Sequence, residues 1–361
     1  MRIIMSQLFI DIKKLKHNIH YVRNLCAEKG LDVIGVVKCC FAYLPIIEVF
    51  QQADIKTLGI SRITDAVRVS SYLKSRPVMT ALPSDEHAED VVRYFKASLN
   101  SEIITIQALA RFSDRNRIEH EIILMVDNGD LREGVMPEDV LTTVGQILDM
   151  KSPYIRFLGL GANMGCCSAV LPDAENIFLL QELASEIERY FGCLVETVSV
   201  GGSVMLDWIE NHELPSKINQ IRIGEAFMLG NIPTINRKHE KLYDDVLILK
   251  GTVLEVKEKP SYPTGNIGSD ALGRRPCLIN RGIRKRAILN FGVADTDPDG
   301  LQPEDEGIRV ISANSDYTIV DVSDCTIPVR VGDVLKFKMN YRAMIQSFLS
   351  PFTRINIIRE M

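Results

Sequence analysis

Residues 33–38 read Val-Ile-Gly-Val-Val-Lys, an apolar β-branched run that ends in a single lysine. Such a run predicts a buried strand. Desolvation of an unpaired ammonium is costly, so Lys38 has two explanations, and the strand alone leaves both open. It can form an imine with an aldehyde, because a low-dielectric site makes a lysine amine nucleophilic. Alternatively, it begins the next loop and reaches solvent.

Around this strand, short β-branched runs alternate with longer amphipathic runs as far as about residue 235. The predicted strands cover residues 8–12, 33–38, 57–61, 77–81, 97–100, 121–127, 156–161, 196–200 and 221–224. The predicted helices cover residues 14–29, 45–53, 64–74, 103–112, 137–150 and 174–190. This alternation is typical of βαβ units and a parallel sheet. Eight repeats after the first strand predict an α/β fold of the (β/α)₈ TIM-barrel type, with functional groups at the carboxyl ends of the strands.

The sequence pattern changes after about residue 244. The predicted strands there cover residues 246–256, 286–291, 309–311, 318–322 and 334–339. Turns rich in Pro, Gly and Asp separate them, and no long helical period appears among them. We therefore expect a barrel domain over residues 1–237 and a C-terminal all-β domain over residues 238–361. The first strand, about residues 7–12, has the alternative of packing with this second domain.

Composition excludes several classes of partner. The net charge is −5 with both signs mixed along the chain, which argues against nucleic acid and anionic membranes. The longest apolar runs, such as residues 122–126, are too short to span a bilayer, so we expect a soluble cytoplasmic protein. The six histidines and eight cysteines show no metal-ligand or disulfide-framework spacing, so neither a metal nor a disulfide is expected.

If the barrel prediction is right, polar residues just after each strand gather at one end. Arg132 lies in the glycine-bracketed polar loop 127–134, where it could clamp a substrate carboxylate. A solvated turn is the ordinary alternative. Asn163 ends the next strand along the chain.

The last two barrel units carry the signature of an anion site. Ser203 follows two glycines, a turn that exposes backbone amides and one hydroxyl. Arg222 is embedded in the final strand, and Gly224 and Glu225 follow it where a helix could begin. Together, Ser203 and the amides near Gly224 predict a phosphate cup. A phosphate cup, a strand-end lysine and a strand arginine describe pyridoxal 5′-phosphate held by a barrel.

With these residues in order, the chain resembles the alanine-racemase-like, fold-type-III family of pyridoxal-phosphate enzymes, and within it the ornithine-racemase-like group. The likeness covers nearly the whole chain. Its short motifs are residues 10–12, 15–18, 36–38, 127–134, 203, 222–224 and 340–342. Segments 281–288 and 297–301 look like motifs of the ornithine-racemase-like group rather than of ordinary alanine racemases. This resemblance shifts the implied substrate from alanine to a basic amino acid such as ornithine.

The resemblance implies roles for individual residues. Lys38 would carry the cofactor and act as one base of an amino-acid racemase. Arg222 would contact the pyridine nitrogen, where a permanent charge discourages ring protonation and weakens the electron sink. Tyr341 would bind the phosphate. If the substrate is a diamino acid, the acidic loops 127–133 and 295–299 are where a partner for its distal ammonium should lie.

The chain departs from the family pattern at the position of the opposite base. Alanine racemases have a tyrosine there, whereas residues 292–295 read Gly-Val-Ala-Asp. Asp295 and Asp316 are the polar groups nearest in motif position, and Tyr317 is a further candidate. Asn163 stands where many relatives have a histidine, and Tyr43 is shifted by one place from a phosphate-binding tyrosine.

The resemblance also implies a head-to-tail homodimer in which the second domain of one subunit completes the site of the other. Two other functions stay open: a pyridoxal-phosphate carrier without turnover, and a fold-type-III amino-acid decarboxylase. The predicted β domain argues against the carrier, which resembles the barrel alone. The turn at residues 201–203 lacks the longer glycine run expected of the decarboxylase.

Overall fold

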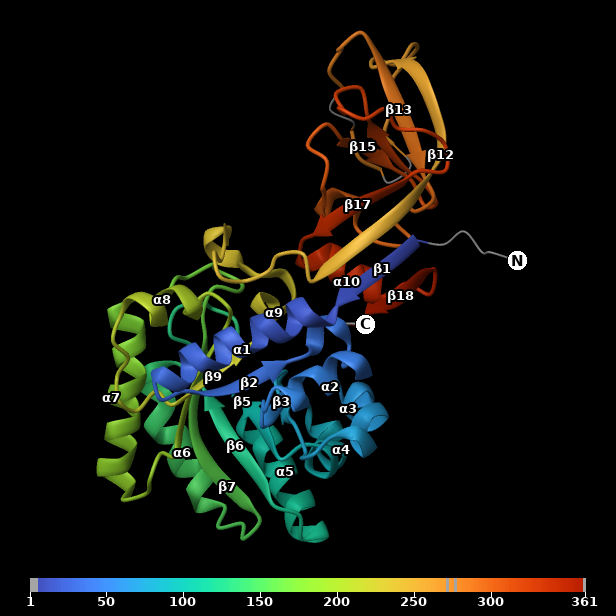
Figure 1. Ribbon diagram of the computed structural model, residues 1–361. Coiled ribbons are helices and arrows are strands. Elements are labelled where there is room, and N and C mark those ends of the chain that lie inside the picture. Colours follow the sequence, from blue (N-terminus) through green and yellow to red (C-terminus); the bar gives the residue numbers. More distant parts are fainter. Residues whose placement is uncertain (1–5, 271–272, 276–277, 360–361) are drawn as a thin grey trace. The chain divides into compact units, whose positions relative to one another are not determined.

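The computed structural model describes residues 6–270, 273–275 and 278–359 (Figure 1). The chain divides into two compact units. The barrel unit is Leu15–Tyr243, and the β unit combines the residues up to Lys14 with those from Asp244 onward. The boundary near residue 237 that the sequence suggested stays a prediction. Cys277 lies outside the described residues.

A closed barrel of eight parallel strands forms the centre of the barrel unit, which confirms the predicted fold class. Its strands are β2 (Asp32–Val36), β3 (Thr57–Ile60), β4 (Val78–Met79), β5 (Ala97–Asn100), β6 (His120–Met125), β7 (Ile155–Asn163), β8 (Thr197–Gly201) and β9 (Gln220–Ile223). Strand β9 pairs with β2 and so closes the circle. The carboxyl ends of all eight strands therefore lie at one end of the barrel.

Helices surround this barrel (Figure 1). They are α1 (Ile12–Glu28), α2 (Leu44–Gln52), α3 (Ile63–Val69), α4 (Ala88–Tyr94), α5 (Ile103–Asn116), α6 (Val140–Asp149), α7 (Ala174–Phe191), α8 (Met205–Asn211) and α9 (Glu225–Leu229). A two-stranded ribbon, β10 (Asn231–Ile232) with β11 (Arg237–Lys238), follows them. Helix α7 shows how local sequence fixes a boundary: Asp173 and Asn176 form a reciprocal capping box, and Gly192 ends the helix in the left-handed conformation.

The interior of the barrel is packed with apolar side chains from several strands. One buried cluster joins Ile34, Val36, Val78 and Ala97. A strand that is buried on both faces reads as a continuous apolar run, which is why the sequence pattern located these strands well. Each fully buried aliphatic side chain contributes about 1.5–3 kcal/mol.

The β unit is a mainly antiparallel sheet. Its strands are β1 (Ser6–Asp11), β12 (Leu247–Pro260), β13 (Ile283–Leu289), β14 (Leu301–Pro303), β15 (Arg309–Ala313), β16 (Thr318–Asp321), β17 (Val334–Met339) and β18 (Thr353–Ile358). The main path runs β14-β17-β12-β13-β16-β15. Strand β1 pairs antiparallel with β12 and parallel with β18, so the first strand of the chain is part of this sheet.

The structure differs from the sequence prediction mainly in short elements. Helix α10 (Tyr341–Leu349) lies in the β unit, where no helix was expected, and α4 and α8 were also missed. Helix α9 begins at Glu225, where the sequence suggested a helix start. Elements of seven to nine residues span fewer than three helical turns, so their periodicity is too brief to recognise. Strand β2 ends at Val36, two residues before Lys38. In the described part of the chain, no helix is long and apolar enough to cross a membrane.

Candidate functional site

Lys38 lies just beyond the carboxyl end of β2. It begins a 3₁₀ turn, Lys38–Cys40, and its side chain is exposed. The next two residues, Phe41 and Ala42, adopt positive φ angles of 49° and 47°, and the Ala42 amide donates to the Val37 carbonyl over 3.0 Å. Two adjacent non-glycine residues in this region are uncommon and mark a locally strained turn. The turn presents the lysine amine at the end of the barrel, an exposed position that is compatible with both explanations of Lys38.

Arg222 lies inside the barrel, on β9. Its side chain is 4% exposed and reaches across β8 to β7. Nη1 donates to the carbonyl of Ser199 over 2.9 Å and to its hydroxyl over 2.7 Å, and Nη2 donates to the Ala162 carbonyl and to Oδ1 of Asn163, each over 2.8 Å. Burial lowers the pKa of Arg222 to about 10, an effect that Glu133 opposes. The guanidinium is thus fixed by four acceptors, none of them charged.

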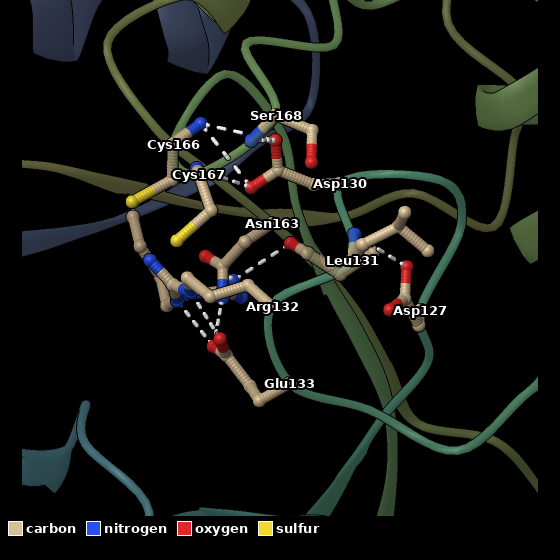
Figure 2. A network of polar contacts seen from close by, with 11 residues as sticks. Asp127, Asp130, Leu131, Arg132, Glu133, Asn163, Cys166, Cys167 and Ser168 are labelled. Atoms are coloured by element: carbon tan, nitrogen blue, oxygen red, sulfur yellow. Dashed lines mark hydrogen bonds and ion pairs between the residues drawn. The ribbon is translucent and has the colours of Figure 1, made fainter.

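Glu133 links this arginine to a second one (Figure 2). Its carboxylate accepts a bidentate contact from Nε and Nη2 of Arg132 and another hydrogen bond from Nδ2 of Asn163. The contact with Glu133 raises the pKa of Arg132. Since Asn163 also accepts from Arg222, one polar chain runs Arg132, Glu133, Asn163, Arg222 across the ends of three strands. The Arg132 guanidinium, predicted to clamp a substrate, is bound here by its neighbour; the clamp stays a prediction.

The other carboxylates of loop 127–133 are also engaged (Figure 2). Asp127 accepts from the amides of Gly129 and Leu131 and so shapes the loop. Asp130 is 3% exposed and accepts from the backbone amides of residues 166–168 over 3.1–3.2 Å. This contact fastens the loop after β6 to the loop after β7. Consequently all three acidic side chains of this loop have hydrogen-bond partners within the barrel unit, and a role for the loop in binding a substrate ammonium stays a prediction.

Ser203, Gly224 and Glu225 lie together where β8 and β9 end. The Ser203 hydroxyl is buried and accepts from the Ala226 amide in the first turn of α9 over 3.0 Å, which leaves the hydroxyl proton available for donation. A Cβ on Gly224 would approach the Val36 carbonyl to 2.9 Å, so only glycine fits beside β2. Glu225 accepts from Asn231, and burial raises its pKa, while that bond and the Lys38 ammonium lower it. The Lys38 amine therefore shares this end of the barrel with the predicted phosphate cup.

The structure brings together seven of the ten predicted site residues. Those at the carboxyl end of the barrel, on or after β2, β6, β7, β8 and β9, are Lys38, Arg132, Asn163, Ser203, Arg222, Gly224 and Glu225. Strands β6, β7, β8 and β9 are consecutive around the barrel, and β2 lies next to β9 because the barrel is closed. The other three residues belong to the β unit.

Asp295, Asp316 and Tyr341 have different surroundings. Asp295 is buried, accepts from the Ser6 hydroxyl over 2.8 Å and from the Gly292 amide over 3.0 Å, and has a pKa raised by burial. Asp316 is exposed in the loop before β16. Tyr341 is the first residue of α10, directly after its N-cap residue. The roles assigned to these three residues stay predictions.

Two polar residues of the site were not singled out from the sequence. Glu133 was included only as part of the acidic loop 127–133, because nothing in a loop pattern tells which side chain turns inward. Ser199 left a readable signal, since it is a polar residue inside the apolar run Thr197–Gly201. A buried hydroxyl in such a strand needs a partner, and Arg222 supplies it.

The fold and the residues at the strand ends define a barrel enzyme of the fold-type-III class. The sequence model described as "Alanine racemase, N-terminal domain" matches residues 10–231. The chain is 36% identical to an ornithine racemase from Acetoanaerobium sticklandii over 347 residues, which cover 96% of this chain and 98% of that protein. It is 35% identical to a lysine racemase from Thermotoga maritima, with 96% of both chains covered.

Solved structures show the same fold. An alanine racemase from Streptomyces coelicolor A3(2) matches with a TM-score of 0.76 at 14% identity, covering 99% of both chains. An alanine racemase from Clostridium difficile 630 matches with a TM-score of 0.71 at 16% identity, covering 96% of this chain and 94% of that one. The chain belongs to the alanine racemase family, whose enzymes use pyridoxal 5′-phosphate.

Proposed function

We propose that this protein is a pyridoxal-phosphate-dependent racemase of a basic amino acid, with ornithine as the favoured substrate. The main support for the proposal is the position of Lys38 in a chain that is 36% identical to an ornithine racemase. Lys38 follows β2, and β2 pairs with β9, the strand that carries Arg222. A lysine racemase is similar at 35% identity, which supports a substrate with a second amino group.

The residues present fit the cofactor. Ser203 offers a buried hydroxyl, and Gly224 lets the backbone at the start of α9 approach β2 closely. When bound, pyridoxal phosphate supplies an aldehyde for the lysine amine and a ring that stabilises negative charge at the substrate Cα. Lys38 would hold the cofactor, and Ser203 with the amides at Gly224 and Glu225 would hold its phosphate. Arg222 and Asn163 would face its ring.

Arg222 would keep its charge at neutral pH, because its pKa of about 10 still lies well above 7. By resemblance to the family, this permanently charged guanidinium would face the pyridine nitrogen and would discourage its protonation. It would thereby limit electron withdrawal by the ring and favour proton exchange at Cα over loss of the carboxylate. Arg132 would orient the substrate carboxylate.

Racemisation requires two proton carriers on opposite faces of the substrate. The Lys38 amine would remove or return the Cα proton on one face. For the other face we propose Asp316 or Asp295, with Tyr317 as a further candidate. Exposure supports Asp316, since the Asp295 carboxylate already accepts two hydrogen bonds inside the β unit.

We also propose a head-to-tail homodimer in which Tyr341 reaches the phosphate of the partner subunit's site. Mixing inactive Lys38→Ala and Tyr341→Ala proteins tests this directly. Shared sites regenerate one intact site in each mixed dimer, so activity should recover to about a quarter of the wild-type value. No recovery after subunit exchange contradicts shared sites.

Two measurements test the function itself. Holoenzyme should show a visible absorbance band that borohydride abolishes and that Lys38→Ala lacks; a band unchanged in that variant contradicts the role of Lys38. Solvent deuterium should enter Cα of ornithine or lysine from either enantiomer, with a loss of at least about a thousandfold in Lys38→Ala. No exchange with any amino acid indicates a carrier, and release of carbon dioxide indicates a decarboxylase.

A further inference from the structure

The buried guanidinium of Arg222 has no carboxylate in direct contact among the hydrogen bonds of the described residues. Its four acceptors are two backbone carbonyls, the Ser199 hydroxyl and the Asn163 amide oxygen. A buried cation held only by neutral acceptors is costly unless an anion lies near. The carboxylate that stabilises its charged form is that of Glu133, one residue further along the hydrogen-bonded chain.

Asn163 bridges these two charges in a single possible orientation. Its Oδ1 accepts from Nη2 of Arg222 over 2.8 Å, and its Nδ2 donates to Oε1 of Glu133. The reversed amide would set its NH₂ against guanidinium donors and its oxygen against a carboxylate, so both contacts would become repulsive. The amide dipole therefore points its negative end at the arginine and its positive end at the glutamate, which polarises both bonds.

Glu133 is linked to two cations, to Arg132 directly and to Arg222 through Asn163. Nε and Nη2 of Arg132 make a bidentate contact with its carboxylate, and Nδ2 of Asn163 donates to one of the same oxygens. The side chain of Glu133 is only 12% exposed, so water screens these charges weakly. Two guanidinium groups and one carboxylate leave the cluster with a single excess positive charge. Loss of the carboxylate would double that charge inside the barrel.

We propose that Glu133 is a positioning residue that, through Asn163, orients Arg222 and balances its charge, and that also holds Arg132. The inference rests on the proposed function, in which Arg222 faces the cofactor ring. In this role Glu133 acts through Arg132 and Asn163 and needs no contact of its own with cofactor or substrate. It sets how positive the environment of the ring nitrogen is, and it keeps two arginines at fixed places across the ends of β6, β7 and β9.

The hydrogen bonds of Glu133 argue against a role in binding the distal ammonium of the substrate. Oε1 accepts from Arg132 and Asn163, and Oε2 accepts from Arg132. An ammonium would have to displace a bidentate guanidinium contact, the strongest pairing a carboxylate makes in proteins. The two roles give different kinetics, because loss of a substrate contact raises KM for basic amino acids, whereas loss of a positioning group lowers kcat.

The test compares four holoenzymes with the wild type. Glu133→Gln removes the charge and keeps the size, and Asn163→Leu removes the bridge. The variant that combines both substitutions completes a double-mutant cycle. Glu138→Gln is the matched control, since it removes the same charge from an exposed residue five positions along the chain. Circular dichroism and thermal unfolding establish that each protein is folded.

Three results are expected. Glu133→Gln lowers kcat by about tenfold to a hundredfold with KM within about threefold, the range typical of groups that orient a binding ligand. The pH midpoint of the cofactor's visible absorbance moves down by about one unit, because a more positive surrounding favours proton loss. The double variant is no worse than the more impaired single variant, since both changes break the same chain. The Glu138→Gln control matches the wild type in kcat, in KM and in the absorbance titration.

Other outcomes overturn the inference. An unchanged absorbance titration in Glu133→Gln, or additive losses in the double variant, contradicts action through Asn163. A KM raised for ornithine and lysine but not for a neutral amino acid assigns Glu133 to substrate binding instead. These results differ from failure of the proposed function, in which the wild-type protein itself forms no lysine-linked cofactor band and exchanges no Cα proton.

Discussion

Arg222 donates a 2.8 Å hydrogen bond to Asn163 directly over the backbone of Gly201. A Cβ at residue 201 would lie 2.5 Å from Nη2 of Arg222 and closer still to Oδ1 of Asn163. Neither atom can retreat cheaply, because the arginine is fixed by four acceptors inside the barrel. The absence of one side chain thus makes room for the central contact of the site.

We expect Gly201→Ala to lower racemase activity by at least about tenfold and to weaken cofactor binding, since an added methyl in a packed interior costs about 1–3 kcal/mol. Titration of the cofactor-free protein with pyridoxal phosphate measures the binding. Gly268→Ala is the control, because a Cβ there meets nothing within 4 Å. Equal affinity in the two variants would show that the Arg222–Asn163 contact tolerates displacement.

Asp130 is expected to restrain the loop after β7. Its carboxylate accepts from the amides of Cys166, Cys167 and Ser168, and Asp130→Asn removes the charge and one acceptor. A lost charge-assisted hydrogen bond costs about 1–3 kcal/mol, so amide hydrogen exchange across residues 164–170 should become faster. Mass spectrometry locates the change. Asp139→Asn, an exposed acid before α6, should leave this exchange as it is; an unaltered rate in Asp130→Asn contradicts the restraint.

The cysteines should react with alkylating agents in two groups. Cys166 and Cys167 are exposed, whereas Cys26, Cys39 and Cys40 are buried. Burial raises the pKa of Cys26 to about 12, so almost no thiolate forms at pH 8. We expect iodoacetamide to modify Cys26 at least about a hundredfold more slowly than the exposed pair. A peptide-level time course measures the rates, and comparable labelling of Cys26 in the folded protein would refute this assignment.

Stability should fall in acid because of His120. Its Nδ1 donates to the Phe95 carbonyl over 3.2 Å, and its Nε2 lies 2.7 Å from the Ser98 hydroxyl, from which the neutral ring accepts. Burial lowers its pKa from 6.5 to about 4. The unfolded chain therefore binds a proton first as the pH falls from 6.5 to 4, and this destabilises the fold by up to about 3 kcal/mol.

Urea unfolding between pH 7 and pH 4 tests this dependence. His120→Asn should show a shallower fall in the free energy of unfolding over that window, even if its stability at pH 7 is lower. His87→Asn, which changes an exposed histidine, should keep the wild-type slope. Equal slopes in wild type and His120→Asn would assign the acid sensitivity to other groups.

The sequence pattern located the barrel strands, whose residues are mostly buried on both faces. Residues 97–100 were predicted as a strand and are β5, and the other barrel strands were placed within about two residues. It failed for short helices such as α8 and α10, because one or two turns give too little pattern. It also placed Lys38 at the end of a buried run, whereas the chain turns before it and exposes it.

The order of the barrel strands, the barrel itself, and the polar residues that follow its strands were determined by the sequence alone, because buried parallel strands leave continuous apolar runs. The pairing of β1 with β12 and β18, and the chain from Arg132 through Glu133 and Asn163 to Arg222, were decided only by the tertiary structure. These contacts join residues far apart along the chain, and which polar atoms meet depends on packing in three dimensions rather than on any local pattern.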